Sequence, residues 1–470
     1  IPGELEKYSM ASFGQTNEIL EAGLEEGRKL YPRLKQLADS LNAIYGPRET
    51  KKEVLPVVHS IKISSYQVNG LSHTTTDFFL HTLNLLTNHN YSADDLAGMV
   101  RQAAGTRYYN RIVYSLQPLP DSSCKIIFDV SENPLTFAKI ALHYNQFSGI
   151  SAILNLTTRD FFTPNSRSLV TLNIGENFRA RAEHLQYFSR GRKLSLVLGT
   201  QFDQFNITTY AQSKEAGIYT QSYFRGDVRL GFAADRNLLI GTGTRFEWIQ
   251  YNPSITSTVA FKGTNDFVTS YFYIRQNSLD RPVYPRRGLK IDAEAGLVFP
   301  QAPDIKIHSA SGDEDTTVAS NAYQRVTFNM EGYTPLGRRS TFLVNLQSGI
   351  NFNYNKNIMN EFSIGGLVNS FHNQITFAGL REGSYYSPSV AAMQIGLRYQ
   401  LFNNIYLTGK ANALFNNFIS ESFFFHNPDF LSGYSLTFTY NFALGPLELS
   451  VMYCDQWKKV LGYVNIGIPF

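Results

Sequence analysis

The chain has 470 residues, which is long for one soluble domain, so the sequence predicts several domains or one large barrel with an appendage. A net charge of +4 is too small to indicate nucleic-acid binding, and the two cysteines, Cys124 and Cys454, form neither a disulfide framework nor a metal-ligand pattern. The mean hydropathy is −0.21, and no apolar run reaches the roughly 18–20 residues that a membrane-spanning helix needs. These values exclude an α-helical membrane protein but not a β-barrel, whose strands are only half apolar.

Residues 1–50 are predicted to be helical, because apolar residues recur there at helical spacing and Pro47 closes the segment. The stretch 8–13 (YSMASF), followed by 19–23 (ILEAG), resembles the last helix of bacterial patatin-like phospholipases. This resemblance implies that a patatin-like domain, a serine lipid acyl hydrolase, precedes the chain, and a generic amphipathic helix is the alternative. The chain begins with Ile and shows no signal peptide, so we expect a processed or truncated N-terminus.

Residues 53–132 are predicted to form a compact α/β unit. The expected elements are strand 57–63, helix 76–86 with Thr75 or Thr76 as its N-cap, a helix opened by Ser92 and ending at Gly105, and strands 112–116 and 125–130. This β-α-α-β-β order, together with the run 105–116 (GTRYYNRIVYSL), resembles a POTRA domain. The resemblance implies exposed strand edges that pair with a passing extended peptide, and a mere spacer is the alternative.

From about Leu135 onward, apolar and polar residues alternate in segment after segment. In one segment the alternation involves Val228, Leu230 and Phe232 against Arg225, Asp227 and Arg229. A sandwich would place such a charged face in bulk water, whereas a barrel would place it in a hydrated lumen and the apolar face against lipid. We predict a mainly β fold: a transmembrane antiparallel β-barrel of about 16 strands over residues 135–470, preceded by one POTRA domain and the short helical segment.

The connections between these segments alternate in length, which is typical of the periplasmic and extracellular sides of such a barrel. The tight turns are 235–237, 335–338 and 445–446, and the long loops are 300–321, 353–389 and 417–431. The acidic run 312–315 is expected at a solvated loop tip, with calcium binding or a bridge to lipopolysaccharide as the alternative.

The last residues also alternate, and the chain stops on Phe470 inside its final amphipathic strand. This ending resembles the closing strand of a bacterial outer-membrane barrel, in which a terminal Phe is the usual assembly signal. The sequence therefore predicts that Phe470 is the assembly signal.

Over roughly residues 53–470, the chain resembles the superfamily of outer-membrane assembly and secretion barrels with POTRA domains, the BamA- and TamA-like bacterial surface antigen family, and most of all its patatin-fused branch. The run 281–289 (RPVYPRRGL) looks like a family motif that leads into a strand. The resemblance implies an outer-membrane barrel with its POTRA domain and N-terminus in the periplasm. It also implies outer-membrane lipids and lipopolysaccharide as neighbours, the barrel-assembly machinery during biogenesis, and a passenger polypeptide or a homodimer as partner.

In that family the sixth extracellular loop folds back into the lumen, and its tip is an aliphatic-Arg-Gly-aromatic motif whose Arg contacts an inward acid on a neighbouring strand. Here the tip, within loop 353–389, is Phe377-Ala378-Gly379-Leu380, with Ala at the position of the Arg. The facing strand offers Lys410 and Asn412, neither of them acidic. Both halves of the latch are absent, which argues against classical insertase or translocase activity. Arg381 is a displaced candidate for the missing Arg, and a loop that only plugs or caps the barrel is the alternative.

The chain carries no recognised catalytic pattern. It contains no G-x-S-x-G elbow, HExxH motif or Walker loop, and its nine His residues show no ligand spacing. We therefore expect no catalytic residue, metal or cofactor within the chain, and the implied upstream domain leaves enzymatic activity of a longer protein open. Three functions remain: a barrel that anchors or translocates an upstream phospholipase-like domain, a non-enzymatic insertion or translocation barrel, and a passive porin.

Overall fold

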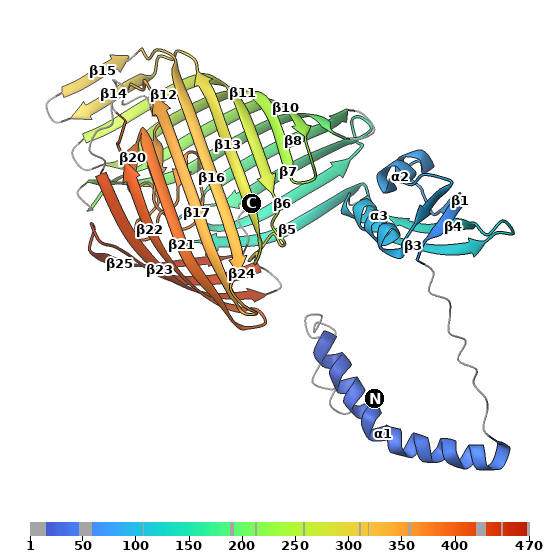
Figure 1. Cartoon of the computed structure of the whole chain (residues 1–470). Coiled ribbons are helices and arrows are strands. Elements are labelled where there is room, and N and C mark those ends of the chain that lie inside the picture. Colours follow the sequence, from blue (N-terminus) through green and yellow to red (C-terminus); the bar gives the residue numbers. More distant parts are fainter. Residues whose placement is uncertain are drawn as a thin grey trace. The chain divides into compact units, whose positions relative to one another are not determined.

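The computed structural model describes most of the chain, namely residues 16–46, 59–106, 108–188, 192–211, 214–256, 259–309, 312–317, 319–355, 359–419, 429–442 and 445–467. Within these ranges it contains a long helix, a small α/β sheet and a large β-barrel (Figure 1). Phe470, the predicted assembly signal, lies outside the described residues.

Helix α1 (Thr16–Tyr45) confirms the helix expected within residues 1–50. Its apolar side chains recur at helical spacing, yet they are exposed along its whole length; examples are Leu20, Leu24 and Leu34, at 63%, 52% and 58%. The helix therefore presents an apolar stripe, which we define as the exposed side chains Leu20, Leu24, Leu30, Leu34, Leu37, Leu41 and Ile44. None of the helices in the described ranges is both long and apolar enough to cross a bilayer.

The small sheet has the predicted order of elements, with one additional short strand. The elements are β1 (Ile61–Asn69), α2 (Thr76–Leu83), β2 (His89–Tyr91), α3 (Ala93–Gly105), β3 (Tyr109–Pro118) and β4 (Cys124–Glu132). The sheet order is β2-β1-β4-β3, with β1 parallel and β3 antiparallel to β4. Its apolar core is formed by Ile63, Phe79, Leu83, Ile126 and Phe128.

Three sequence-based expectations for this sheet needed correction. Of the strand predicted at 57–63, residues 57–58 lie outside the described ranges, and β1 runs from Ile61 to Asn69. Helix α2 ends at Leu83, because Asn84 adopts a left-handed conformation (φ 59°) that stops the helix. The three residues of β2 were missed because a strand that short shows no period-two pattern. The Thr75 N-cap is confirmed, since its side chain accepts from the Phe78 amide at 3.3 Å.

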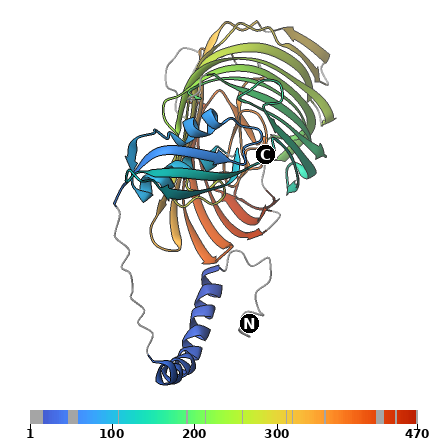
Figure 2. The ribbon, with the colours of Figure 1, turned by 90° about the vertical axis from the view of Figure 1, so that its right-hand side faces the viewer.

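Sixteen strands of the described chain form the closed barrel wall, in agreement with the predicted number, and Figure 2 shows the wall from a second direction. Each pairs antiparallel with its neighbours, and eleven precede the long loop while five follow it, as expected. The strands are β5 (Thr136–Asn145), β6 (Gly149–Arg159), β7 (Ser166–Gly175), β8 (Phe178–Phe188), β9 (Leu194–Ala211), β10 (Lys214–Ala233), β11 (Leu238–Thr256), β12 (Val259–Asn277), β13 (Gly288–Val298), β16 (Tyr323–Pro335), β17 (Ser340–Phe352), β21 (Ser389–Phe402), β22 (Ile405–Asn416), β23 (Asp429–Phe442), β24 (Gly445–Cys454) and β25 (Lys459–Ile466).

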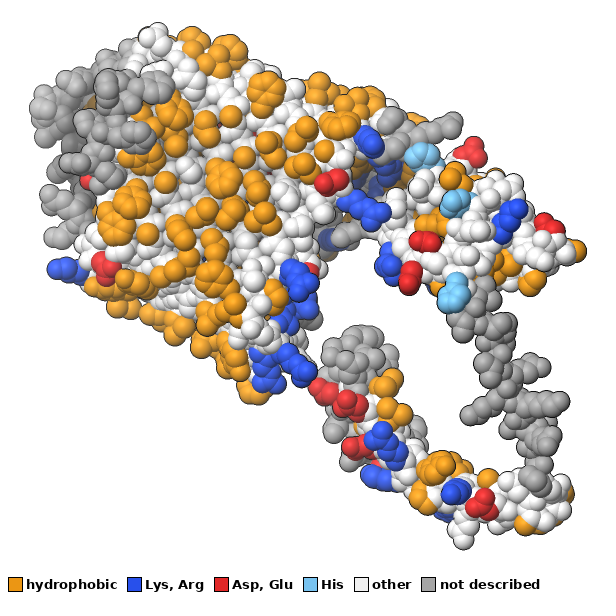
Figure 3. Space-filling model, viewed as in Figure 1, with side chains coloured by type: hydrophobic (Ala, Val, Ile, Leu, Met, Phe, Trp, Pro, Cys, Tyr) orange, Lys and Arg blue, Asp and Glu red, His pale blue; other side chains and the backbone are white. Residues whose placement is uncertain are grey.

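The two faces of the wall have the predicted chemistry. On β10, Val228 and Phe232 are 49% and 45% exposed on the outside, where apolar side chains cover the barrel (Figure 3). On the same strand Asp227 and Arg229 are only 6% exposed, because they face the interior. The interior charges form ion pairs, such as Arg229 with Glu183 at 3.1 Å. Pairing is required there, because an isolated buried charge is costly.

The three long loops lie at one end of the barrel, and the tight turns predicted at 235–237 and 335–338 lie at the other. The predicted alternation in length holds only in part, because two residues, 176–177, join β7 to β8 at the first end and ten residues, 278–287, join β12 to β13 at the second. We call the end at which β5 begins the turn end and the opposite one the loop end. The loop predicted at 300–321 contains a hairpin, β14 (Asp304–Ser309) and β15 (Gly312–Thr317), and the acidic run 312–315 lies in β15 rather than at a loop tip. The hairpin forms because β12 is much longer than β13, and β14 pairs with the part of β12 that β13 does not reach.

The turn predicted at Gly445-Pro446 is not formed by these two residues. Both residues are the first residues of β24, where Pro446 is aligned with Asn441 of β23. The first residue positions of a strand accept Pro, because few ladder hydrogen bonds depend on its missing N–H there. The residues between the two strands, 443–444, lie outside the described ranges.

Glu132 at the end of β4 stabilises the small sheet. Its carboxylate accepts from the backbone amides of Ser72, His73 and Thr74 at 2.9, 2.6 and 2.9 Å. Burial raises the pKa of Glu132, but hydrogen bonds from Thr74, Ser72 and His73 outweigh it and lower the pKa to about 2. A lowered folded-state pKa stabilises the fold above the unfolded value of about 4.5, and this contribution is lost as the pH falls toward 2.

We expect Glu132→Gln to destabilise the small sheet by about 1–2 kcal/mol at pH 7, and to have little effect near pH 2. Hydrogen exchange of the α2 and β4 amides in the full chain measures the change. Asp129→Asn is the matched control, since Asp129 accepts only the Asn69 side chain at 3.0 Å and lies on the same strand. An equal effect of both substitutions at pH 7 would contradict the assignment.

Candidate functional site: the lumenal loop and the seam

The loop between β17 and β21 folds into the barrel interior. It forms three short strands, β18 (Phe362–Ile364), β19 (Gln374–Ile375) and β20 (Tyr385–Ser387), in the order β19-β18-β20. Phe362 and Ile364 are 1% and 0% exposed, so the loop has a core of its own. It is therefore not the structureless segment that its length alone would allow.

The tip of this loop, Phe377 to Leu380, docks on the inner faces of β23 and β24. Phe377, Ala378 and Leu380 are fully buried. Gly379 has φ +97°, and a Cβ there would lie 2.4 Å from the carbonyl oxygen of Tyr453 on β24. A Cβ on Gly433 of β23 would lie 2.1 Å from the Ala378 carbonyl oxygen. Both contacts exclude a side chain, so two glycines allow the tip to lie directly against the wall.

Side-chain amides attach the loop to the neighbouring strands. Gln347 of β17 accepts from the amide and hydroxyl of Thr376 at 2.8 and 2.7 Å. Gln394 of β21 donates to the Thr376 carbonyl at 3.2 Å. Sequence reasoning did not identify these two glutamines, because inward polar residues on barrel strands share one pattern and nothing in the alternation distinguishes a loop anchor from a water-facing residue.

The loop also contacts the neighbouring strand β16 and the more distant strands β8 and β11. Arg325 of β16 donates to the Asn360 side chain at 2.6 Å, and Arg179 of β8 donates to the Ser370 carbonyl at 2.7 Å. His372 lies 3.3 Å from Glu247 of β11. Contacts on several sides mean that the loop occupies the lumen instead of lining one side of it.

Ala378 and Asn412 both lie beside Gly433 of β23. Ala378 packs in an apolar cluster with Met452 of β24 and Tyr463 of β25. Asn412 donates to the Gly433 carbonyl at 3.0 Å, next to the Ala378 carbonyl, and its own side-chain oxygen has no hydrogen-bond partner in the described part of the chain. Apolar packing thus stands where the family resemblance places an ion pair.

Lys410 and Arg381 lie away from this contact. Lys410 faces a polar lumenal cavity of about 430 Å³ toward the turn end, beside Glu331 and Glu448. Arg381 is half-exposed, and its Nη1 lies 3.4 Å from Oε1 of Glu215 on β10. Arg381 therefore pairs with the wall at the loop end and not with the strand that carries Lys410.

The barrel closes weakly between its first and last strands. Within the described residues, which end at Gly467, only Asn145–Asn465 and Tyr144–Ile466 align between β5 and β25, and the Gln146 amide donates to the Val464 carbonyl at 3.2 Å. In the described ranges, every other neighbouring pair of barrel strands aligns eight or more residue pairs. We call this junction of β5 and β25 the seam.

A chain of polar side chains strengthens the seam toward the turn end. His143 of β5 lies 3.2 Å from the Asn465 side-chain oxygen, and the Asn465 amide donates to Glu448 of β24 at 3.0 Å. Tyr284, from the turn 278–287, donates to the other Glu448 oxygen at 2.6 Å. Arg398 stacks on the Tyr284 ring at 5.4 Å. We call His143, Asn465, Glu448 and Tyr284 the seam relay. Tyr284 belongs to the run RPVYPRRGL, so this run has a structural role at the seam.

Sequence and structure comparisons agree on the family. The sequence profile of the OMP85 superfamily matches residues 124–470, which is well over half of the chain. The chain belongs to the OMP85 superfamily. Among curated protein sequences, none matches it significantly.

Solved structures show the same OMP85-type fold. BamA from Haemophilus ducreyi lacking POTRA domains 1–3 is similar with a TM-score of 0.61 and 13% identity, over 86% of this chain and 84% of that one. CdiB from Acinetobacter baumannii is similar with a TM-score of 0.50 and 10% identity, over 87% of this chain and 74% of that one. The predicted outer-membrane barrel is confirmed, and this OMP85 chain is an outer-membrane protein.

We expect Ala378→Arg to release the OMP85 loop tip, because the guanidinium would lie against Met452 and Tyr463 with no acid beside it. An unpaired buried charge costs about 3–5 kcal/mol. Adding Asn412→Asp should restore much of the loss. Protease sensitivity of residues 359–388 in the folded barrel, measured for both single variants and the double variant, gives the coupling energy. Simple additivity of the two substitutions would contradict the placement of the tip.

Proposed function

We propose that this chain inserts or translocates polypeptides through the outer membrane by opening its seam. The weak pairing of β5 with β25 is the observation that carries the proposal. Separating these strands costs fewer backbone hydrogen bonds than separating any other neighbouring pair described. A polypeptide strand that enters there would satisfy the exposed strand edges by β-augmentation.

The filled lumen supports a lateral route over a central one. The loop is tied to β8, β11, β16, β17 and β21, and its tip is buried against β23 and β24. A passive porin needs a continuous aqueous path, which such a loop obstructs. The porin alternative therefore has no support in the geometry.

The absent latch does not weaken this proposal. Ala378 is buried with Met452 and Tyr463, so the loop tip is docked without an ion pair. Replacing a buried ion pair by well-packed apolar groups is often neutral or stabilising. The loop that an insertase needs in its lumen is therefore retained by different chemistry.

The small α/β sheet fits the role of a POTRA domain on the periplasmic side. Its β3 is a ten-residue edge strand, since the sheet order is β2-β1-β4-β3. An edge of that length offers unpaired N–H and C=O groups to an extended client. The partners in this proposal are an unfolded outer-membrane or passenger polypeptide and, during its own biogenesis, the barrel-assembly machinery.

Locking the seam tests the proposal. Tyr144 and Ile466 are directly opposite, so Tyr144→Cys with Ile466→Cys, in a Cys124→Ser background, places two thiols within reach of a disulfide. The remaining Cys454 is buried. If client strands pass through the seam, oxidation should reduce insertion of a second barrel into proteoliposomes about tenfold or more, and reductant should restore it.

The matched control locks a fully paired junction. Tyr440→Cys with Leu447→Cys joins opposite residues of β23 and β24, which align along their length. This disulfide should leave insertion unchanged. Unaltered insertion with the locked seam, or equal loss with both locks, would overturn the lateral route.

A second candidate function is anchoring or translocation of an upstream patatin-like domain. It is favoured by the apolar stripe of α1, because a helix with that much exposed leucine needs another surface to cover it. The intact mass of the protein from native outer membrane is the test. A mass well above 53.1 kDa together with phospholipase activity supports this function, and a mass equal to the chain contradicts it.

A further inference from the structure

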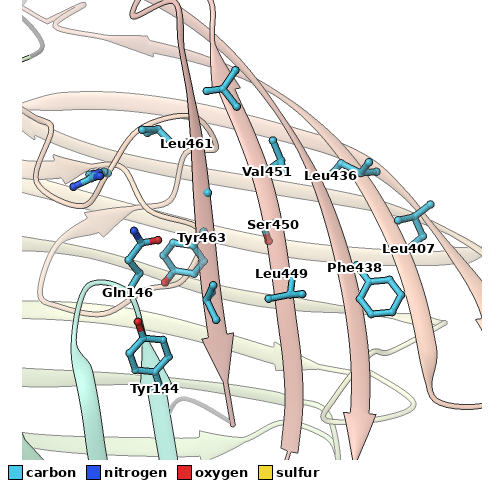
Figure 4. Close-up of a pocket in the computed structure, with 14 residues that line it drawn as sticks. Tyr144, Gln146, Leu407, Leu436, Phe438, Leu449, Ser450, Val451, Leu461 and Tyr463 are labelled. Carbon is cyan, nitrogen blue, oxygen red and sulfur yellow. The ribbon is translucent and has the colours of Figure 1, made fainter.

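An apolar groove of about 710 Å³ runs over the outer faces of the last barrel strands and reaches the seam. Leu449 and Val451 of β24 and Val460 of β25 form part of its lining. Figure 4 shows Gln146, which follows the first strand, beside Tyr463 of the last strand, with Tyr144 of the first strand and Leu461 of the last on either side of them. The groove thus joins the lipid-facing surface to the gap between β5 and β25.

The gap exists because β5 ends early. The chain leaves β5 at Asn145 and begins β6 at Gly149, whereas β25 continues toward the loop end. Residues 460–463 consequently align with no residue of β5 in the described ranges. Gly462 widens the opening, since a Cβ there would meet nothing within 4 Å.

Arg381 is the single charged side chain among the described residues that line the groove. Its backbone is fixed, because its carbonyl accepts from the Ser384 amide at 3.3 Å and lies against Gly365, where a Cβ would be 1.9 Å away. Its side chain pairs with Glu215 at 3.4 Å, and the two are 46% and 66% exposed. A pair that exposed is weak, so Arg381 remains available to a stronger anion.

We infer that this groove binds a phosphate-bearing membrane lipid, with an acyl chain along β24 and β25 and the phosphate on Arg381. The acyl part of the occupant would come from the bilayer, because most of the apolar lining, such as Leu436, Val451 and Val460, is exposed on the lipid-facing side of the wall, while Arg381 reaches the groove from the lumenal loop. Guanidinium is the side-chain cation that best matches phosphate geometry. The lipid covers the unaligned edge of β25 while the seam is closed. This site does not depend on polypeptide insertion.

Lipid retention by the full chain tests the site. The purified protein in neutral detergent is incubated with palmitoyl-oleoyl-phosphatidylglycerol or palmitoyl-oleoyl-phosphatidylcholine, and retained lipid is counted by native mass spectrometry. We expect tighter retention of phosphatidylglycerol, and Arg381→Gln should weaken that retention about tenfold, which corresponds to one charge-assisted contact. Glu215→Gln should strengthen it, because the competing carboxylate is removed.

Two further variants separate the groove from general effects. Gly462→Phe should fill the groove and reduce retention of both lipids, since the added side chain has free space. Gly226→Phe is the matched control, because a Cβ at Gly226 meets only the Phe224 ring, at 3.8 Å, and the residue lies on β10, which contributes no residue to the groove. Its retention should equal that of the unmodified chain.

Unchanged phosphatidylglycerol retention in Arg381→Gln would overturn the site. An equal loss in Gly226→Phe and Gly462→Phe would overturn it as well. If the groove holds a polypeptide edge instead of a lipid, Gly462→Phe will impair insertion of a client barrel while lipid retention stays constant, which also contradicts the inference. Failure of the seam lock with lipid retention as expected would leave this site intact, so the two proposals fail separately.

Discussion

Closure is the constraint on which the whole structure depends. A chain that crosses a bilayer in strands must pair the backbone groups of every strand on both sides, because the hydrocarbon offers no water to replace a missing partner. In the described part of the chain, fifteen junctions of the barrel meet that demand over eight or more aligned residue pairs, whereas the junction of β5 with β25 has two. Because backbone pairing is missing there, the seam is the least stable junction of the described wall. The remaining support there comes from side chains.

Two sets of side chains provide that support, at different heights of the seam. Toward the turn end, the seam relay carries hydrogen bonds from Tyr284 through Glu448 and Asn465 to His143. Nearer the loop end, Tyr463 of β25 packs on Ala378 of the lumenal loop. Side-chain contacts of this kind cost less free energy to break than a continuous ladder of backbone hydrogen bonds. The seam is therefore closed, but it is the easiest junction of the described wall to separate.

Much of this architecture was predictable from period-two alternation. The strand number, the inward direction of Asp227, Arg229 and Asn412, and the long loop after eleven strands all follow from which residues alternate. Alternation fixes the face of each residue but carries no information on strand partners. It therefore missed the hairpin β14–β15, which depends on the unequal lengths of β12 and β13.

The candidate site was predictable only in part for the same reason. The tip Phe377 to Leu380 was recognised by its resemblance to a motif, and its burial follows from its apolar residues. The seam was not recognised, because β5 and β25 both alternate as well as any other strand. Its weakness arises from where β5 ends at Asn145 relative to β25. Gln347 and Gln394 were missed because their partner, Thr376, lies on the loop and leaves no trace in strand periodicity.

The apolar contact of Ala378 with Met452 and Tyr463 connects the lumenal loop to the last two strands, and therefore to the seam. Tyr463 lies on β25 and Met452 on β24, and both contact Ala378. Moving β25 outward separates Tyr463 from Ala378 and exposes apolar surface that only the closed arrangement buries. An ion pair would keep much of its attraction at a distance, whereas apolar packing is lost within about an ångström or two of separation. On the proposed lateral route, a contact of this chemistry therefore favours two discrete states, with the seam closed and the tip docked in one, and the seam open and the tip released in the other.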